Sequence, residues 1–271
     1  ETAYPGDQIT VCLETNDVDS AQLESAPAPQ FLPELEILYE DQDILAVNKP
    51  AGLVTHPSGS HYSDSLSNQV AAYFRSKDEP TKVRSIGRLD KETSGILLFA
   101  RNQTAAARLQ KQRENGISEK TYLAAVSGSM LEDTDGTFHA ITTPLAPDPD
   151  NRLKMVISPG SSLPGSKPAV TLYSVLKSTA PGSRISASLV MLRLKTGRTH
   201  QIRVHMASIH HPVAGDPVYG PHNCITSLHG QCLHAKTLGF VHPITGEQLR
   251  FDSELPDYFT HFLATLRRKN T

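Results

Sequence analysis

The chain has 271 residues, with 26 lysines and arginines against 28 aspartates and glutamates, and 38% of its residues are hydrophobic. No apolar run approaches the roughly 18 residues that a membrane-spanning helix needs. Three cysteines in a chain of this length do not make a disulfide framework, so the composition favours a cytoplasmic protein without membrane segments.

The first 33 residues read as a tail and a linker. A turn at residues 5–7 is followed by one short strand, and the stretch "ESAPAPQFLP" is rich in proline and alanine and has neither a helical nor a strand period. We therefore divide the chain into a tail and linker at 1–33 and one compact domain at 34–271.

Short strands dominate the compact domain. The sequence predicts strands at 36–41, 44–52, 95–100, 120–128, 136–142, 152–157, 168–176 and 184–194, and a pair of strands within 233–251 that a turn at 244–247 joins. Helices are predicted at 63–77, with Ser63 or Asp64 as the cap, and at 102–116, 199–209 and 257–268. Strands outnumber helices without a strict alternation, which predicts an α+β fold around a mixed, largely antiparallel central sheet with flanking helices and a cleft.

The net charge of −2 conceals a strong asymmetry along the chain. Residues 1–50 carry 11 acids and a single basic residue, Lys49, whereas residues 151–215 carry nine lysines and arginines and no acid. One reading is a strand-rich core segment whose polar positions happen to be basic. The other is a surface built to face a polyanion such as RNA.

The stretch "SIGRLDKETSGILLFARN", residues 85–102, places Asp90 two residues after Arg88 and just before a buried strand. The run from Thr93 to Gly95 can turn the chain tightly and donate hydrogen bonds to a carboxylate. An acid fixed in this way suits a nucleophile or a general base. A carboxylate that merely caps the loop is an equally good reading of the spacing alone.

A second constellation lies in "LKTGRTHQIRVHMASIHHPVAGDPVYG", residues 194–220. On a helix that starts near Thr199, Arg198, His200 and Arg203 gather at the N-terminal end, where the helix dipole favours anions. The histidines of this stretch do not predict a zinc site, because their spacing does not fit zinc ligation and no cysteine pair accompanies them. A helix-surface salt bridge is the alternative role for Arg203.

These motifs carry a resemblance to a known family. "GRLDKETSGILLFARN", "KTYLAAVSG", "KTGRTHQIRVHMASIHHPVAGDPVYG" and "LHAKTLGFVHPITGEQLRF" occur in the order and spacing of the RluA-type pseudouridine synthases, and "VNKPAGLVTHPS" resembles the opening motif of that family. The resemblance covers about residues 35–260. It implies the pseudouridine synthase fold and the isomerisation of specific uridines in structured RNA, either ribosomal or transfer RNA.

The resemblance also implies roles for single residues. Asp90 resembles the catalytic aspartate, Tyr122 the active-site tyrosine that stacks on the base, and Arg203 the arginine that pairs with the aspartate. Arg88 resembles the residue that enters the RNA and helps to displace the target base. Lys195, Arg198 and His200 are further candidates for RNA contacts. No cofactor and no metal is implied, and we expect a monomer.

The chain departs from the family at Gly87, where a histidine often precedes the Arg-Leu-Asp motif. The N-terminal "AYPGDQITV" resembles the end of an S4-type RNA-binding domain, and a native tail is the alternative. Two other functions stay open: a catalytically silent RNA-binding or ribosome-assembly module on the same fold, and an aspartate-dependent glycosidase. The glycosidase would need a second acid about 5–10 Å from the first, and we identified none in these motifs.

Overall fold

The structure is a computed structural model that describes residues 34–57, 63–79, 82–151, 153–180, 183, 185–220, 228 and 230–267. The tail and linker expected at 1–33, and with them the S4-type interpretation, lie outside the described residues. None of the helices in the described ranges combines the length and the apolar character needed to cross a bilayer.

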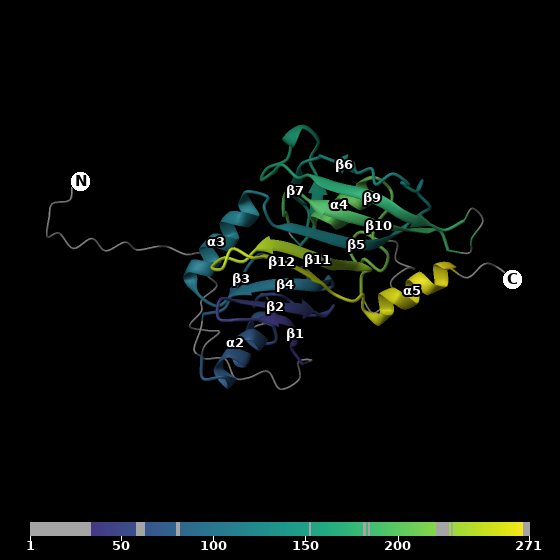
Figure 1. The fold of residues 1–271 in the computed structure, drawn as a ribbon. Coiled ribbons are helices and arrows are strands. Elements are labelled where there is room, and N and C mark those ends of the chain that lie inside the picture. The colour runs from purple at the N-terminus through teal and green to yellow at the C-terminus, as the bar shows by residue number, and fades with distance from the viewer. Residues whose placement is uncertain are drawn as a thin grey trace, which may run out of the picture.

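One large sheet runs through the molecule (Figure 1). Ten strands form it, in the order β1-β2-β4-β11-β5-β10-β9-β6, with β12 paired to β11 and β3 to β4. The strands are β1 Glu36–Glu40, β2 Ile44–Lys49, β3 Arg84–Ser85, β4 Ser94–Ala100, β5 Glu119–Ser127, β6 His139–Ile141, β9 Thr171–Ser178, β10 Ala187–Leu194, β11 Leu233–Val241 and β12 Gln248–Asp252. A separate two-stranded sheet pairs β7 Leu145–Pro147 with β8 Met155–Ile157.

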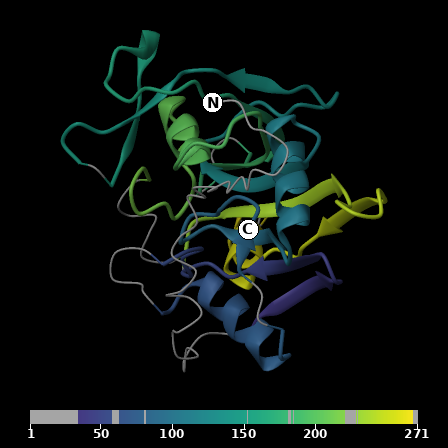
Figure 2. The ribbon, with the colours of Figure 1, turned by 90° about the vertical axis from the view of Figure 1, so that its left-hand side faces the viewer.

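The helices flank this sheet on both sides (Figure 2). They are α2 Leu66–Ser76, α3 Gln103–Glu114, α4 Gln201–Ser208 and α5 Asp257–Arg267, and a 3-10 turn η1 spans Pro159–Ser161. Helices α2 and α4 pack Phe74 and Met206 into the core on one face of the sheet, whereas α3 packs Leu109 into a separate core on the other face. Every pairing in the large sheet is antiparallel except the one between β4 and β11, so the predicted mixed, largely antiparallel α+β fold is confirmed.

Two helix boundaries differ from the prediction. The cap of α2 is Ser65, not Ser63 or Asp64. The Ser65 hydroxyl accepts a hydrogen bond from the Asn68 amide, and the Asn68 side chain accepts one from the Ser65 amide, which together form a capping box. Helix α4 begins at Gln201, not near Thr199, because His200 adopts a left-handed conformation with φ of 54°. The short strands β3 and β7 and the turn η1 were not predicted, since two or three residues carry too little periodicity to be recognised.

The parallel pairing of β4 with β11 fixes the start of β4. Gly95 has a φ of 109°, and a Cβ atom at this position would lie 2.4 Å from the carbonyl oxygen of Ala235. Only glycine allows this approach without a shift of the backbone. The loop that precedes β4, which carries Asp90, is therefore anchored against the centre of the sheet.

Candidate active site

Asp90 lies in the loop between β3 and β4, and its side chain is 18% exposed. The Thr93 amide donates to the backbone carbonyl of Asp90 at 3.1 Å and closes the loop into a turn. The Thr93 hydroxyl accepts a hydrogen bond from Gln231 at 2.6 Å, and the Ser94 hydroxyl bonds Nδ1 of His234 at 2.8 Å. These hydroxyls were expected to donate to the Asp90 carboxylate; instead they fasten the loop to His234 in β11 and to Gln231, two residues before that strand.

The segment after β2 holds the same loop from its other end. Thr55 donates its hydroxyl hydrogen to the Leu89 carbonyl at 2.8 Å and accepts from the Leu89 amide at 3.2 Å. Lys49 is fully buried, and its ammonium group donates to the backbone carbonyls of Pro50, Leu53 and Lys91 at 2.8, 2.6 and 3.0 Å. The residues on both sides of Asp90 are thus bonded to the end of β2 and the segment that follows it.

Arg203, in α4, lies between two carboxylates. Its Nε and Nη2 donate to Oδ2 and Oδ1 of Asp216 at 2.7 and 2.9 Å, and its Nη1 donates to Oδ2 of Asp90 at 3.2 Å. The predicted contact between Asp90 and Arg203 is therefore confirmed. Burial opposes the charge on Arg203, but the bonds and charges of Asp216 and Asp90 outweigh burial and raise the pKa of the guanidinium. The ring of Tyr219 covers the guanidinium, with 5.1 Å from the ring centroid to its central carbon.

Asp216 is a site residue that sequence reasoning missed. It is fully buried, and beyond its two bonds to Arg203 its Oδ1 accepts the backbone amides of Val218 and Tyr219 at 2.8 and 3.0 Å. The sequence did offer a signal, because Asp216 is the first acid after the acid-free stretch 151–215 and lies within a quoted motif. The premise that these motifs hold no second acid is therefore wrong. A carboxylate with four hydrogen bonds and no exposure is nevertheless unsuited to act as a second catalytic acid or base.

Tyr122 lies on β5, and its side chain is 7% exposed. Burial and the charge of Asp90 raise the pKa of its hydroxyl, and the charge of Arg113 opposes them. Tyr122 therefore stays protonated at neutral pH. The ammonium of Lys120, two residues earlier on the same strand, lies 5.5 Å from the centroid of the Tyr122 ring. Tyr122 is thus close enough to Asp90 to sense its charge, as the prediction requires.

His200 lies inside the site, not on its outer surface. Its Nε2 is 4.0 Å from Oδ2 of Asp90, and its Nδ1 is 3.0 Å from the hydroxyl of Tyr219. The Tyr219 hydroxyl also accepts the Met155 amide at 2.8 Å, which connects the β7–β8 hairpin to the site. Burial lowers the pKa of His200, with Asp90 acting in the opposite direction. A direct phosphate contact suits His200 less well than the sequence suggested, because its ring packs between protein groups.

The other predicted RNA-contacting residues lie further out. Arg88 and Lys195 are exposed, and among the described residues no acid forms an ion pair with either. Arg198 is half-buried and donates from Nε to the Pro168 carbonyl at 3.0 Å. Of the nine basic residues of 151–215, Arg203 is neutralised by Asp216 and is not available to RNA.

The histidines of 200–211 point to separate partners. His205 bonds Thr171 and the Thr143 carbonyl, and His211 bonds the Ser127 carbonyl. Within the described ranges, a different group, Asp41, Asp43 and His242, brings potential metal ligands together. The Asp41 carboxylate already accepts hydrogen bonds from Tyr39, from His242 and from the backbone amides at 43 and 44. We therefore interpret this group as a hydrogen-bonded turn and not as a metal site.

Comparisons with known proteins identify the family of this chain. The family model described as RNA pseudouridylate synthase matches residues 43–208. The RNA pseudouridine synthase YlyB of Bacillus subtilis is 39% identical over 267 residues, which cover 97% of this chain and 81% of that protein. Ribosomal large subunit pseudouridine synthase D of Neisseria meningitidis serogroup A is 38% identical over 275 residues, covering 97% and 67%.

A solved structure adds to this agreement. The structure titled human RNA pseudouridylate synthase domain containing 1 matches with a TM-score of 0.66 at 25% identity, over 89% of this chain and 98% of that one. The chain therefore belongs to the RNA pseudouridylate synthase family. It is an RNA pseudouridine synthase, an isomerase whose substrate is RNA.

Proposed function

We propose that this chain converts specific uridines of large-subunit ribosomal RNA to pseudouridine, with Asp90 as the catalytic carboxylate. The observation that carries the role of Asp90 is its position: it is held 3.2 Å from a buried guanidinium, yet its side chain stays partly open to a substrate. The choice of RNA is supported by relatives of 38% identity that are named ribosomal large subunit pseudouridine synthase D.

The reaction breaks the bond between N1 of the uracil and C1′ of the ribose and forms a bond between C5 and C1′. Asp90 either attacks the sugar or assists departure of the base, and the freed uracil turns before it reattaches. C5 loses one proton and N1 gains one, so the product has the same atoms as the substrate. Neither a redox partner nor a leaving molecule is needed.

Arg203 serves this reaction by holding the Asp90 carboxylate in one orientation. Its other two nitrogens, Nε and Nη2, both donate to Asp216, so the guanidinium cannot turn away from Asp90. Tyr122, protonated and next to Asp90, offers a ring on which the freed base can stack and a hydroxyl that can donate a hydrogen bond. His200 is placed to orient the same carboxylate, with its ring backed by Tyr219.

The target uridine must leave its helix before Asp90 can reach it. Flipping a base out of a stack costs a few kcal/mol, which contacts to the flipped base and the neighbouring backbone must offset. Arg88 is exposed two residues before Asp90 and is the proposed residue that enters the RNA. Lys195 and Arg198 would bind phosphates, which position the RNA without specifying its sequence.

A tritium-release assay tests this proposal, because isomerisation exchanges the hydrogen on C5. The purified chain is incubated with an in vitro transcript of large-subunit ribosomal RNA labelled at C5 of uridine, and with a transfer RNA transcript labelled in the same way. We expect stoichiometric release from one or a few positions of the ribosomal transcript. Release from the transfer RNA alone would refute the proposed target, and the appearance of free uracil would show a glycosidase.

A further inference from the structure

Arg113, near the C-terminal end of α3, lies beside both loops of the active site. A Cβ atom on Gly87 would be 3.6 Å from the Arg113 guanidinium carbon, and one on Gly197 would be 3.3 Å from its Nη2. Gly87 lies three residues before Asp90, and Gly197 lies three residues before His200. Because neither glycine has a side chain, the guanidinium of Arg113 rests directly against both loops.

The charge of Arg113 has no anionic partner in the described part of the chain. The residue is exposed, and its one side-chain hydrogen bond is a long one of 3.4 Å to Oε1 of Gln110. Lys120 in β5 is close enough to be affected by this charge, since Arg113 contributes to lowering the pKa of its ammonium group. Two cations that repel each other, with no acid ion-paired to either among the described residues, favour the binding of an anion.

Lys120 is half-buried and directed toward the ring of Tyr122. Burial, together with the charge of Arg113, lowers the pKa of its ammonium group to about 7. The negative charge of an anion bound between Lys120 and Arg113 would offset both effects and favour the charged form of the lysine. The charge of Arg113 also acts on Tyr122 and that of Lys120 on His234, and neither of these two groups is anionic at neutral pH.

We propose that Arg113 and Lys120 form a phosphate-binding site at the entrance to the Asp90 site, which holds the RNA backbone beside the flipped uridine. Arg113 reaches this place because position 87 is glycine, where the resemblance would lead one to expect histidine. Its planar guanidinium can meet a phosphate with two donors. This inference rests on the proposed function, since it names a further contact of the same RNA at the same site.

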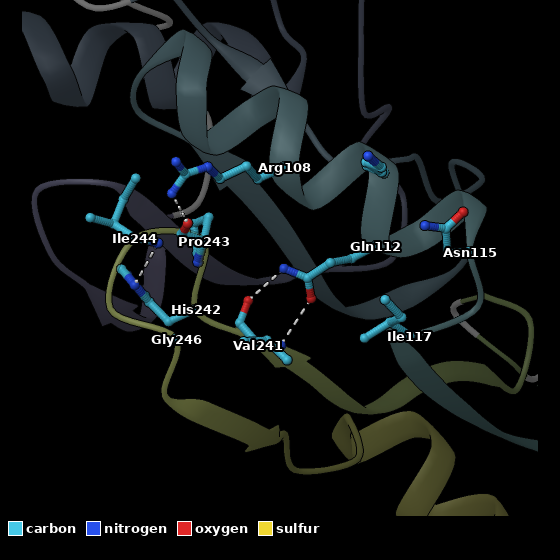
Figure 3. Close-up of a pocket in the computed structure, with 10 residues that line it drawn as sticks. Arg108, Gln112, Asn115, Ile117, Val241, His242, Pro243, Ile244 and Gly246 are labelled. Carbon is cyan, nitrogen blue, oxygen red and sulfur yellow. Dashed lines mark hydrogen bonds between the residues drawn. The ribbon is translucent and has the colours of Figure 1, made fainter.

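The same helix supplies a matched control. Lys111 lies two residues before Arg113, and so on a different face of α3. It lines a separate hollow of about 440 Å³ between α3 and the β11–β12 turn (Figure 3). Figure 3 shows Gln112 bonded twice to the backbone of Val241 at the floor of this hollow. Lys111 is exposed and, like Arg113, has no acid partner in the described ranges. It therefore carries the same charge on the same helix without facing either catalytic loop.

The experiment compares Arg113→Gln, Arg113→Lys, Lys120→Gln and Lys111→Gln, each in an Asp90→Asn background so that binding is measured without turnover. The full chain is titrated with an in vitro transcript of large-subunit ribosomal RNA at several salt concentrations. We expect Arg113→Gln to flatten the plot of log affinity against log salt by about 0.7 to 0.9. Lys120→Gln should do the same in part, Arg113→Lys should restore the slope, and Lys111→Gln should leave it unchanged.

A purely structural role for Arg113 would reduce stability or turnover without a change in this slope. An unchanged slope in Arg113→Gln, or an equal change in Lys111→Gln, would overturn the inference. Turnover by the unmodified chain on the same transcript is measured in parallel. If that turnover is absent, the proposed function fails; if it is present and the slope of Arg113→Gln is unaltered, only the phosphate site fails.

Discussion

The inner part of the active site and its outer rim use the same kinds of charge in opposite ways. The inner site consists of Arg203, Asp216 and Asp90, where each charge faces an opposite charge and Asp216 is fully buried. The outer rim, which we define as Arg88, Arg113, Lys195 and Arg198, has no acid paired with any of its cations in the described residues. Paired buried charges fix geometry, whereas unpaired surface cations remain available to bind phosphates.

This difference teaches which substitutions should be severe. Removal of Arg203 or Asp216 leaves the buried charge of the other without compensation, which is costly. Removal of a rim cation loses one contact that water and salt already weaken.

Asp90→Asn should abolish turnover, with a loss of roughly a thousandfold or more, because a neutral amide can neither attack the sugar nor assist cleavage. The fold and the affinity for RNA should remain nearly intact. Single-turnover assays on the ribosomal transcript measure this. Glu92→Gln, a neighbouring acid without an inner-site bond, is the matched control and should keep its activity. If Asp90→Asn retains more than about a tenth of the rate, Asp90 is not the catalytic carboxylate.

Asp216→Asn should destabilise the protein by about 3 kcal/mol or more, because Arg203 loses its buried counter-charge. Turnover should fall as well, since Arg203 would no longer be held toward Asp90. Urea unfolding measures the change in free energy of unfolding. Asp252→Asn removes a surface partner of Lys236, with the Asp252 side chain 56% exposed, and should cost less than about 1 kcal/mol. Equal effects of the two variants would contradict the contrast between the inner site and the surface.

His234 should make the stability of the fold sensitive to acid. Burial lowers its pKa from 6.5 to about 4, while the same histidine in the unfolded chain keeps its ordinary value. Between about pH 6.5 and 4 the unfolded state therefore binds a proton that the folded state does not, so stability is full above this window and falls as pH decreases through it. The contribution is up to about 3 kcal/mol.

His234→Gln tests this linkage, because glutamine can bond Ser94 or Ser253 but cannot titrate. The variant should lose less free energy of unfolding than the parent when pH is lowered from 7 to about 4.5. Denaturant unfolding at both values gives the comparison. The same acid dependence in both proteins would show that the stability loss comes from other buried histidines.

Lys195→Gln should produce the smallest effect. We expect the salt slope of RNA binding to flatten by about 0.7 to 0.9, with turnover of bound RNA unchanged. Arg198→Gln should flatten the slope less, because its Nε is already engaged with the Pro168 carbonyl. Equilibrium titration at several salt concentrations measures both. A larger change in slope for Arg198→Gln than for Lys195→Gln would contradict this order and would indicate that the RNA backbone lies closer to Arg198.

The sequence was enough to predict the strand-rich α+β fold, most of the strands, and the pairing of Asp90 with Arg203, because long motifs in a fixed order carry that information. It did not predict that Asp216 holds Arg203, that Lys49 binds three carbonyls around the Asp90 loop, or that Arg113 reaches Gly87. Each of these is a contact between residues distant in the chain, such as Lys49 and Lys91, which are 42 positions apart. Local periodicity contains no signal for such contacts.

Sequence motifs were enough to identify the family of this protein and to single out Asp90 as the proposed catalytic carboxylate. The turn after Asp90, its glycine and the apolar strand that follows are local features of the sequence. The bonds that hold this loop in place come from distant residues, namely Lys49, Thr55, Gln231 and His234. Only the tertiary structure decided which charges are buried and paired and which are left for RNA. That outcome depends on how β4, β11 and α4 meet, since packing of whole elements sets the desolvation of each charge and the distance to its partner.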